Sequence, residues 1–162
     1  MKTLVVGLGN LLLKDEGFGV RVIYYLRERY MFSEEVMFLD GGTGAFFLLP
    51  YLEEADRVIF VDVVKAGGSP GEIYEGTLEE IEAFLVERIS LHEIGLFDLL
   101  AILKFKGKNF REIHLIGIEP KEIAIGEELS KCLLERLPEV AKRVLQKLSE
   151  WGISYEEKVS TA

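Results

Sequence analysis

Two carboxylates and one imidazole stand out because each lies at the end of a predicted strand or the beginning of a predicted helix. Glu16 comes just before the first helix, Asp62 lies near the end of an apolar strand, and His92 begins a later helix. Oxygen and nitrogen ligands of this kind suit nickel, zinc or manganese. A helix N-terminus disfavours a protonated imidazole, so His92 is expected to stay neutral with a ring nitrogen free for a metal ion. Together the three residues predict a metal site.

Each of these side chains also has a purely structural interpretation. Glu16 alone is a first-turn carboxylate favoured by the helix dipole, and Asp62 alone caps a loop. Spacing by itself leaves both interpretations open. The other histidine, His114, lies in mid-strand between apolar residues, and the single cysteine, Cys132, falls in a helical pattern. Both are predicted to be structural.

The elements that would position these residues follow from apolar runs separated by helical periodicity. The runs typical of buried strands are residues 3–8, 35–39, 57–64 and 112–118. The order βαβαβ in the first part of the chain implies a parallel sheet with right-handed crossovers. In open parallel sheets, ligands bind outside the carboxyl ends of the strands, which is where the three candidate ligands would converge.

We therefore expect a three-layer α/β sandwich. Its central sheet is mostly parallel, helices cover both faces, and residues 72–75 form an antiparallel edge strand. Thr77 and Glu80 have the spacing of a capping box, as do Ser90 and Glu93. Pro138 is expected to split the long C-terminal helical pattern and to begin a second helix.

Length and composition fit a single globular domain. The chain has 162 residues, 49% of them apolar, and we expect one α/β domain over residues 1–154 with a mobile tail over 155–162. No apolar run approaches the roughly 18 residues of a membrane span, and the N-terminal segment does not resemble a signal peptide, so we expect a cytoplasmic protein. The net charge of −9, without a basic patch, argues against nucleic acid and anionic membranes as partners.

The segment Gly7-Leu8-Gly9-Asn10 raises the alternative of a dinucleotide site. The fingerprint requires a third glycine at position 12, where Leu12 stands, and an acidic residue about 20 positions on, whereas Asp40 lies about 30 on. A tight turn from strand to loop explains the two glycines without a ligand.

Five blocks of the sequence, taken in order, closely resemble the hydrogenase maturation proteases, the endopeptidases that trim the large subunit of NiFe hydrogenases. The blocks are GLGNLLLKDEGFG at 7–19, LDGGT at 39–43, Val61-Asp62 with Pro70-Gly71 downstream, SLHEIGLFDLL at 90–100, and GIEP at 117–120. They span nearly the whole expected domain. Together they are far more specific than any one of them alone.

The resemblance implies an endopeptidase that removes a C-terminal peptide from a nickel-loaded large-subunit precursor. Glu16, Asp62 and His92 match the family's metal-binding positions and become the candidate catalytic residues. The segment Asp40-Gly41-Gly42-Thr43 matches a loop used in substrate handling. Such enzymes are often classed as aspartic-type proteases. The nickel is expected to come with the substrate rather than to be held tightly by the enzyme.

The usual protease signatures are missing from the sequence. Cys132 has no evident histidine partner, and neither a Gly-x-Ser-x-Gly elbow nor a His-Glu-x-x-His helix is present. The attacking water is then activated by a metal ion or by a carboxylate, and the sequence leaves both open. A nickel-sensing chaperone on the same fold, without hydrolysis, and a nucleotide-binding flavodoxin-like protein are the alternatives.

Overall fold

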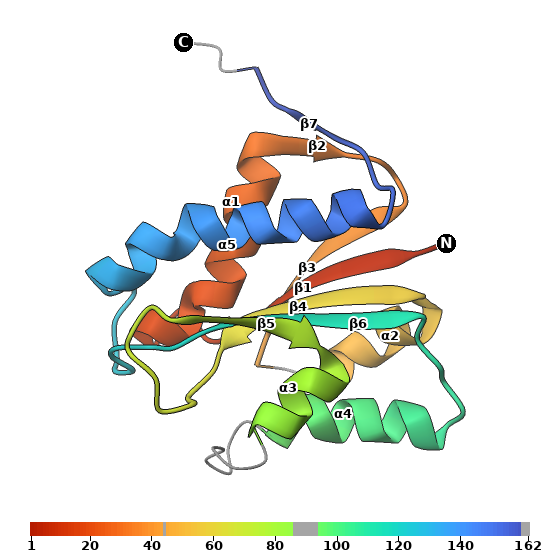
Figure 1. Cartoon of the computed structure of the whole chain (residues 1–162), viewed down its shortest axis with the longest axis horizontal. Coiled ribbons are helices and arrows are strands. Elements are labelled where there is room, and N and C mark those ends of the chain that lie inside the picture. Colours follow the sequence, from red (N-terminus) through yellow and green to blue (C-terminus); the bar gives the residue numbers. More distant parts are fainter. Residues whose placement is uncertain (44, 86–93, 160–162) are drawn as a thin grey trace.

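The computed structural model describes residues 1–43, 45–85 and 94–159. Its centre is a five-stranded sheet in the order β3-β1-β4-β6-β5 (Figure 1). The strands are β1 (Thr3–Leu8), β3 (Val36–Gly42), β4 (Arg57–Val63), β5 (Ile73–Thr77) and β6 (Glu112–Ile118). All neighbouring pairs are parallel except β5 with β6, which is antiparallel. The predicted parallel sheet and its antiparallel edge strand are therefore confirmed.

Helices cover both faces of this sheet. They are α1 (Phe18–Arg29), α2 (Leu49–Glu54), α3 (Leu78–Leu85), α4 (Ile94–Phe105) and α5 (Lys131–Glu150), with short 3-10 helices η1 (Lys14–Gly17) and η2 (Ala45–Leu48). Helices α1 and α5 lie on one face, and α2, α3 and α4 lie on the other (Figure 1). The three layers expected from the sequence are present.

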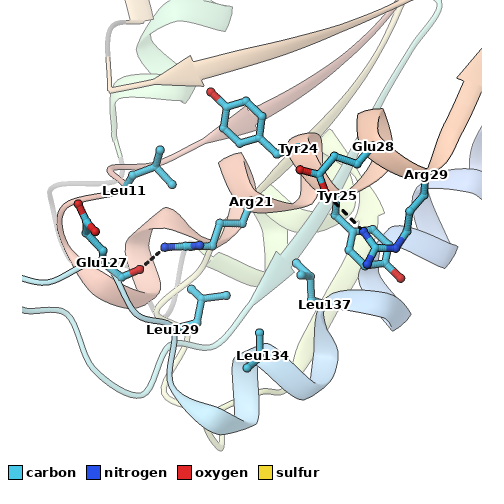
Figure 2. Close-up of a pocket in the computed structure, with 10 residues that line it drawn as sticks. All are labelled: Leu11, Arg21, Tyr24, Tyr25, Glu28, Arg29, Glu127, Leu129, Leu134 and Leu137. Carbon is cyan, nitrogen blue, oxygen red and sulfur yellow. Dashed lines mark hydrogen bonds and ion pairs between the residues drawn. The ribbon is translucent and has the colours of Figure 1, made fainter. Parts of the chain in front are cut away.

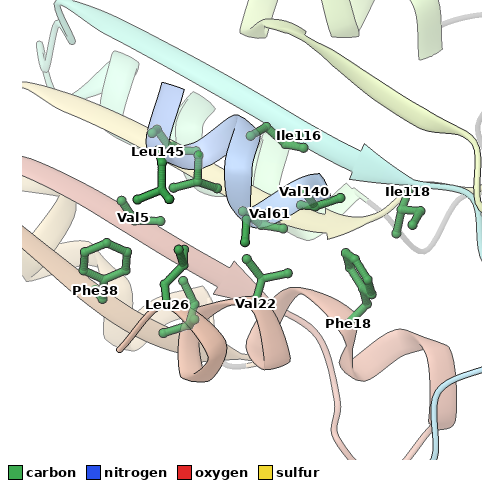
Figure 3. Close-up of a cluster of buried hydrophobic side chains, with 14 of the residues drawn as sticks. Val5, Phe18, Val22, Leu26, Phe38, Val61, Ile116, Ile118, Val140 and Leu145 are labelled. Carbon is green, nitrogen blue, oxygen red and sulfur yellow. The ribbon is translucent and has the colours of Figure 1, made fainter. Parts of the chain in front are cut away.

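Two apolar cores result from the alternation of side chains along the strands. Val5 of β1 faces the α1 and α5 side, whereas Leu4 and Val6 face the other side. Figure 3 shows the first core, to which Val22 of α1, Val61 of β4 and Val140 of α5 all contribute. Because the central strands are buried on both faces, they read as continuous apolar runs in the sequence.

Helix α5 differs from the expectation, because Pro138 does not split it. The helix runs unbroken from Lys131 to Glu150 with the proline inside. Pro138 lies on the exposed side, so the carbonyl of Leu134, which loses its helical partner, can be hydrated. The buried stripe that includes Val140, Val144 and Leu148 holds both halves against the sheet. Burial of this face outweighs the loss of one hydrogen bond.

Two short strands that the sequence did not predict form a separate antiparallel pair. Strand β2 (Tyr30–Phe32) follows α1 and pairs with β7 (Tyr155–Glu157), so the first three residues of the expected tail are part of a small sheet. The capping box at the start of α3 is confirmed: the Glu80 carboxylate accepts from the Thr77 N–H at 3.2 Å, and the Thr77 hydroxyl accepts from the Glu80 N–H at 3.3 Å. The second predicted box, Ser90 with Glu93, lies outside the described residues. Among the helices described, none is long and apolar enough to cross a membrane.

Candidate functional site

The glycines of the first block bring helix α1 into direct contact with the ends of two strands. A Cβ atom on Gly9, whose φ is +134°, would lie 1.8 Å from the carbonyl oxygen of Glu16. A Cβ atom on Gly19 would lie 2.2 Å from the carbonyl oxygen of Val61, at the end of β4. Only glycine permits these approaches. Close packing therefore explains Gly9 and Gly19, whereas the sequence predicted only a tight turn at Gly7 and Gly9.

This packing places Glu16 and Asp62 at the same edge of the sheet. Glu16 lies in η1, directly beyond the carboxyl end of β1, and Asp62 is the penultimate residue of β4. Both side chains are half-buried. One oxygen of Asp62 accepts from the N–H of Val63 at 2.7 Å. Two of the three predicted ligands are thus brought to one edge by neighbouring strands.

The third predicted ligand, His92, lies outside the described residues. Within the described ranges, no three His, Cys, Asp or Glu side chains gather closely enough to hold a metal ion. The predicted site has its two carboxylates at the sheet edge and depends on His92 for a third ligand. It stays a prediction.

A buried carboxylate next to Glu16 anchors the loop that bears it. Asp15 is fully buried and accepts hydrogen bonds from the N–H groups of Lys121 and Glu122, at 2.9 and 2.8 Å. It also accepts from the N–H and the hydroxyl of Ser130, each at 2.7 Å. Burial acts to raise the pKa of Asp15, but these four hydrogen bonds together lower it below its usual value. Asp15 therefore holds the segment 121–130 against η1 and positions Glu16.

A second buried carboxylate braces the loop that follows Asp62. Glu119 accepts from the N–H groups of Ala66 and Gly67, at 2.8 and 3.0 Å, and from the hydroxyl of Tyr74 at 3.1 Å. Burial, reinforced by the adjacent Glu119 carboxylate, raises the pKa of Tyr74. Glu119 directly follows the apolar run 112–118, a position that by itself indicates only the end of a strand. Its place in the block GIEP was the one signal that it did more.

The predicted substrate segment ends strand β3. The two oxygens of Asp40 accept from the hydroxyl of Tyr24 at 2.8 Å and from the N–H of Gly42 at 3.0 Å. The hydrogen bond to Asp40 raises the pKa of Tyr24. Gly42 has φ +49° and turns the chain, and Thr43 beyond it is exposed.

Strand register fixes the distance between this segment and the carboxylate edge. Asp40 pairs with Gly7, and Gly7 pairs with Val61, the neighbour of Asp62. Two strand spacings therefore separate Asp40 from β4, roughly 10 Å. The three strands present their ends side by side at one edge.

His114 is structural, as predicted. It is buried in β6, and its Nε2 atom lies 2.6 Å from Oε2 of Glu75, which also pairs with Arg143 at 3.2 Å. The hydrogen bond to His114, with Arg143 nearby, lowers the pKa of Glu75. These residues line a polar pocket of about 470 Å³ beside α5, away from the strand ends that carry Glu16 and Asp62.

A second pocket, of about 350 Å³, lies between α1 and α5 (Figure 2). Leu129, Leu134 and Leu137 form its apolar side, and the Arg21 guanidinium donates to the carbonyl of Glu127 along it. Leu11, in the loop between β1 and η1, closes one end. Arg29 pairs with Glu28 at 3.8 Å and lies over the ring of Tyr25.

The comparisons with known proteins agree on one family. The sequence profile of the hydrogenase maturation proteases matches residues 20–147. The hydrogenase 2 maturation protease of Escherichia coli is 34% identical over 154 residues, covering 94% of each chain. The chain belongs to the hydrogenase maturation protease family.

Other members of the family support the same assignment. The hydrogenase expression/formation protein HoxM of Azotobacter vinelandii is 38% identical over 152 residues, which cover 93% of this chain and 73% of the relative. The solved structure of the hydrogenase maturating endopeptidase HybD from E. coli superposes with a TM-score of 0.90 at 33% identity, covering 98% of both chains. The NiFe hydrogenase maturation protease HybD from Thermococcus kodakarensis superposes with a TM-score of 0.74 at 31% identity, covering 91% of this chain and 99% of that one. As a maturation protease, this chain is a peptide-bond hydrolase.

Proposed function

We propose that this maturation protease removes the C-terminal peptide from the large-subunit precursor of a NiFe hydrogenase after nickel has been inserted. The observation that carries the proposal is the placement of Glu16 and Asp62. Both carboxylates lie at the carboxyl edge of a parallel sheet, on elements locked together through Gly9 and Gly19. This edge is where ligands bind in open α/β sheets.

Glu16, Asp62 and His92 would contact the nickel that the precursor carries. Two carboxylates and an imidazole are a donor set that suits this ion, which here is part of the substrate. When bound in this way, the nickel would supply a Lewis acid for hydrolysis of the peptide bond. The three side chains would thereby bind only a precursor that has received its nickel, and would hold its C-terminal segment in one orientation.

The carboxylates are also the groups that can move the protons of hydrolysis. A deprotonated Glu16 or Asp62 can take a proton from the attacking water, and a carboxylic acid can return a proton to the leaving amine. This is the chemistry on which an aspartic-type classification rests. Asp15 and Glu119 support it by fixing the backbone on either side of the edge, at residues 121, 122 and 130 and at residues 66 and 67.

Thiol catalysis has no support in the described part of the chain. Cys132 is half-buried in α5 and lies against Gly71, where an added Cβ would be 3.7 Å from the Cβ of the cysteine. His114 is the one described histidine, and it is bonded to Glu75. A thiol nucleophile needs a nearby base or cation to form a thiolate.

The decisive experiment is incubation of the purified protein with a nickel-loaded precursor, followed by mass spectrometry. The expected result is a single cleavage that shortens the precursor at its C-terminus. Glu16→Gln and Asp62→Asn should each abolish the cleavage. A nickel-sensing chaperone on the same fold would leave the length of the precursor unchanged, and that outcome would overturn the proposal.

A further inference from the structure

The outer edge of the sheet beside the site is formed by β3. Because Thr3 donates to the carbonyl of Glu35 and pairs in register with Val36, the residues of β3 alternate in the direction of their backbone groups. Those at odd positions bond to β1. The even positions 36, 38 and 40 direct their N–H and C=O groups away from the sheet.

Two of these outward groups, one on Val36 and one on Phe38, are already bonded to the protein. The N–H of Val36 donates to Ser33, and the Arg27 guanidinium donates to the carbonyl of Phe38. The register shifts at Gly42, whose carbonyl accepts from the N–H of Gly9 and whose N–H is bonded to the Asp40 side chain.

Asp40 differs from Val36 and Phe38, each of which has one of its two outward groups bonded, because both of its own outward groups are open. Among the described residues, nothing bonds to its backbone N–H or C=O, nor to the N–H of Phe38. One donor and one acceptor on the same edge residue form the minimal unit of strand pairing.

Helix α1 holds this edge in a fixed shape. Tyr24 and Arg27 lie one turn apart and bond to the Asp40 carboxylate and the Phe38 carbonyl. Because Arg27 occupies the Phe38 carbonyl, an added strand can pair only with the unbonded N–H and C=O groups of Asp40. Side-chain bulk is absent from the two residues that follow, Gly41 and Gly42.

We propose that an extended segment of the precursor's C-terminal region binds as an added strand on β3, with its backbone hydrogen-bonded to Asp40. This inference rests on the proposed function and specifies how the substrate is held. Backbone pairing supplies affinity that does not depend on side-chain identity. The exposed aromatic rings of Phe46 and Phe47, 73% and 49% accessible, follow in η2 and would receive apolar side chains of the segment.

The distances fit a single continuous peptide. An added strand would lie three strand spacings from β4, roughly 14 Å from the Asp62 position. An extended chain covers roughly 3.3 Å per residue, so four or five residues connect the two places. The paired segment would then lie a few residues from the scissile bond.

The test uses nickel-loaded precursors whose C-terminal segment is semisynthetic and carries one N-methyl group, moved residue by residue. Methylation removes a single N–H donor, and loss of one hydrogen bond of about 1 kcal/mol corresponds to about a five-fold decrease in kcat/KM. We expect that decrease at a residue whose N–H faces Asp40 and little change at its two neighbours, whose N–H groups point away. Amide exchange of the enzyme should slow at Asp40 when the unmodified precursor is bound.

Strand addition would be overturned if kcat/KM were the same for every N-methylated precursor, or if amide exchange at Asp40 did not change. Cleavage of the unmodified precursor would in that case still support the proposed function. Absence of cleavage of the unmodified precursor would overturn the proposed function itself. Phe47→Ser should raise KM, with Phe105→Ser as the matched control, because Phe105 is 94% exposed at the end of α4 and distant in sequence from this edge. An equal effect of the two variants would count against the assigned role of η2.

Discussion

The carboxylate of Asp15 accepts two hydrogen bonds from Ser130, one from its N–H and one from its hydroxyl, both at 2.7 Å. Ser130 is the residue that precedes α5, so this contact joins the C-terminal helix to the loop carrying Glu16. The site is thus supported by a part of the chain 115 positions away in sequence.

Asp15→Asn is expected to destabilise the protein by about 3 kcal/mol, because hydrogen bonds to a buried charge are lost. Whichever way the amide is turned, its NH2 group must face at least one backbone N–H that now donates to the carboxylate. Urea unfolding measures the change. The control is Asp56→Asn, since Asp56 accepts one exposed bond, from the N–H of Lys2, and should cost less than about 1 kcal/mol. Equal losses would refute the special role of Asp15.

The same residue predicts how stability depends on pH. The folded-state pKa of Asp15 is lower than its unfolded value of about 3.8, so its contribution is complete above that value and is lost as pH falls through the folded pKa. The difference in unfolding free energy between the wild type and Asp15→Asn should therefore be constant near neutral pH and shrink below about pH 4. A difference that stayed constant down to pH 2 would contradict this prediction.

His92→Ala is expected to abolish processing of the nickel-loaded precursor and to leave the fold intact, because a ligand at a sheet edge is not part of the core. Precursor cleavage and the circular dichroism melting curve are the two measurements. His114→Ala is the matched contrast: loss of the buried contact with Glu75 should lower the melting temperature. If His92→Ala lost helical signal together with activity, His92 would be a structural residue.

Reagents directed at thiols and at serine nucleophiles should leave the activity unchanged. The reason is that the proposed chemistry uses Glu16 and Asp62, whereas Cys132 is half-buried in α5. Treatment with iodoacetamide, with Cys132→Ser as the control, is a direct measurement. Inactivation of the wild type that is absent in the variant would identify a cysteine protease instead.

The purified enzyme is expected to hold little metal of its own after dialysis. A site that recognises nickel already bound to the precursor should bind the free ion weakly. Otherwise free nickel would occupy the site before the substrate arrived. Elemental analysis of the dialysed enzyme tests the first point, and cleavage of precursors with and without nickel tests the second. Tightly bound stoichiometric zinc or nickel, with equal cleavage of both precursors, would indicate a conventional metallopeptidase.

The strands, and their alternation with helices along the chain, could be predicted because the pattern that indicates each element lies within that element's own residues. A strand buried on both faces must be apolar along its length, so β1 and β4 could be recognised from their own residues. The same reasoning placed Glu16 and Asp62 at the carboxyl edge, since each follows or ends such a run. The resemblance of five ordered blocks then identified the family, and the comparisons confirm it.

Tertiary structure decided the roles of the neighbouring acids. Asp15 and Glu16 are adjacent and chemically alike, yet Asp15 is fully buried under the segment 121–130 and Glu16 is left half-buried at the edge. Local pattern cannot separate them, because the donors that select Asp15 lie more than 100 residues away. The conformation at Pro138 also depends on tertiary structure. The proline by itself favours a break in the helix, and burial of the apolar stripe of α5 prevents that break. Sequence determines which residues prefer a strand, a helix or a turn, whereas the partner that a buried polar group finds depends on which distant segments the folded chain brings beside it.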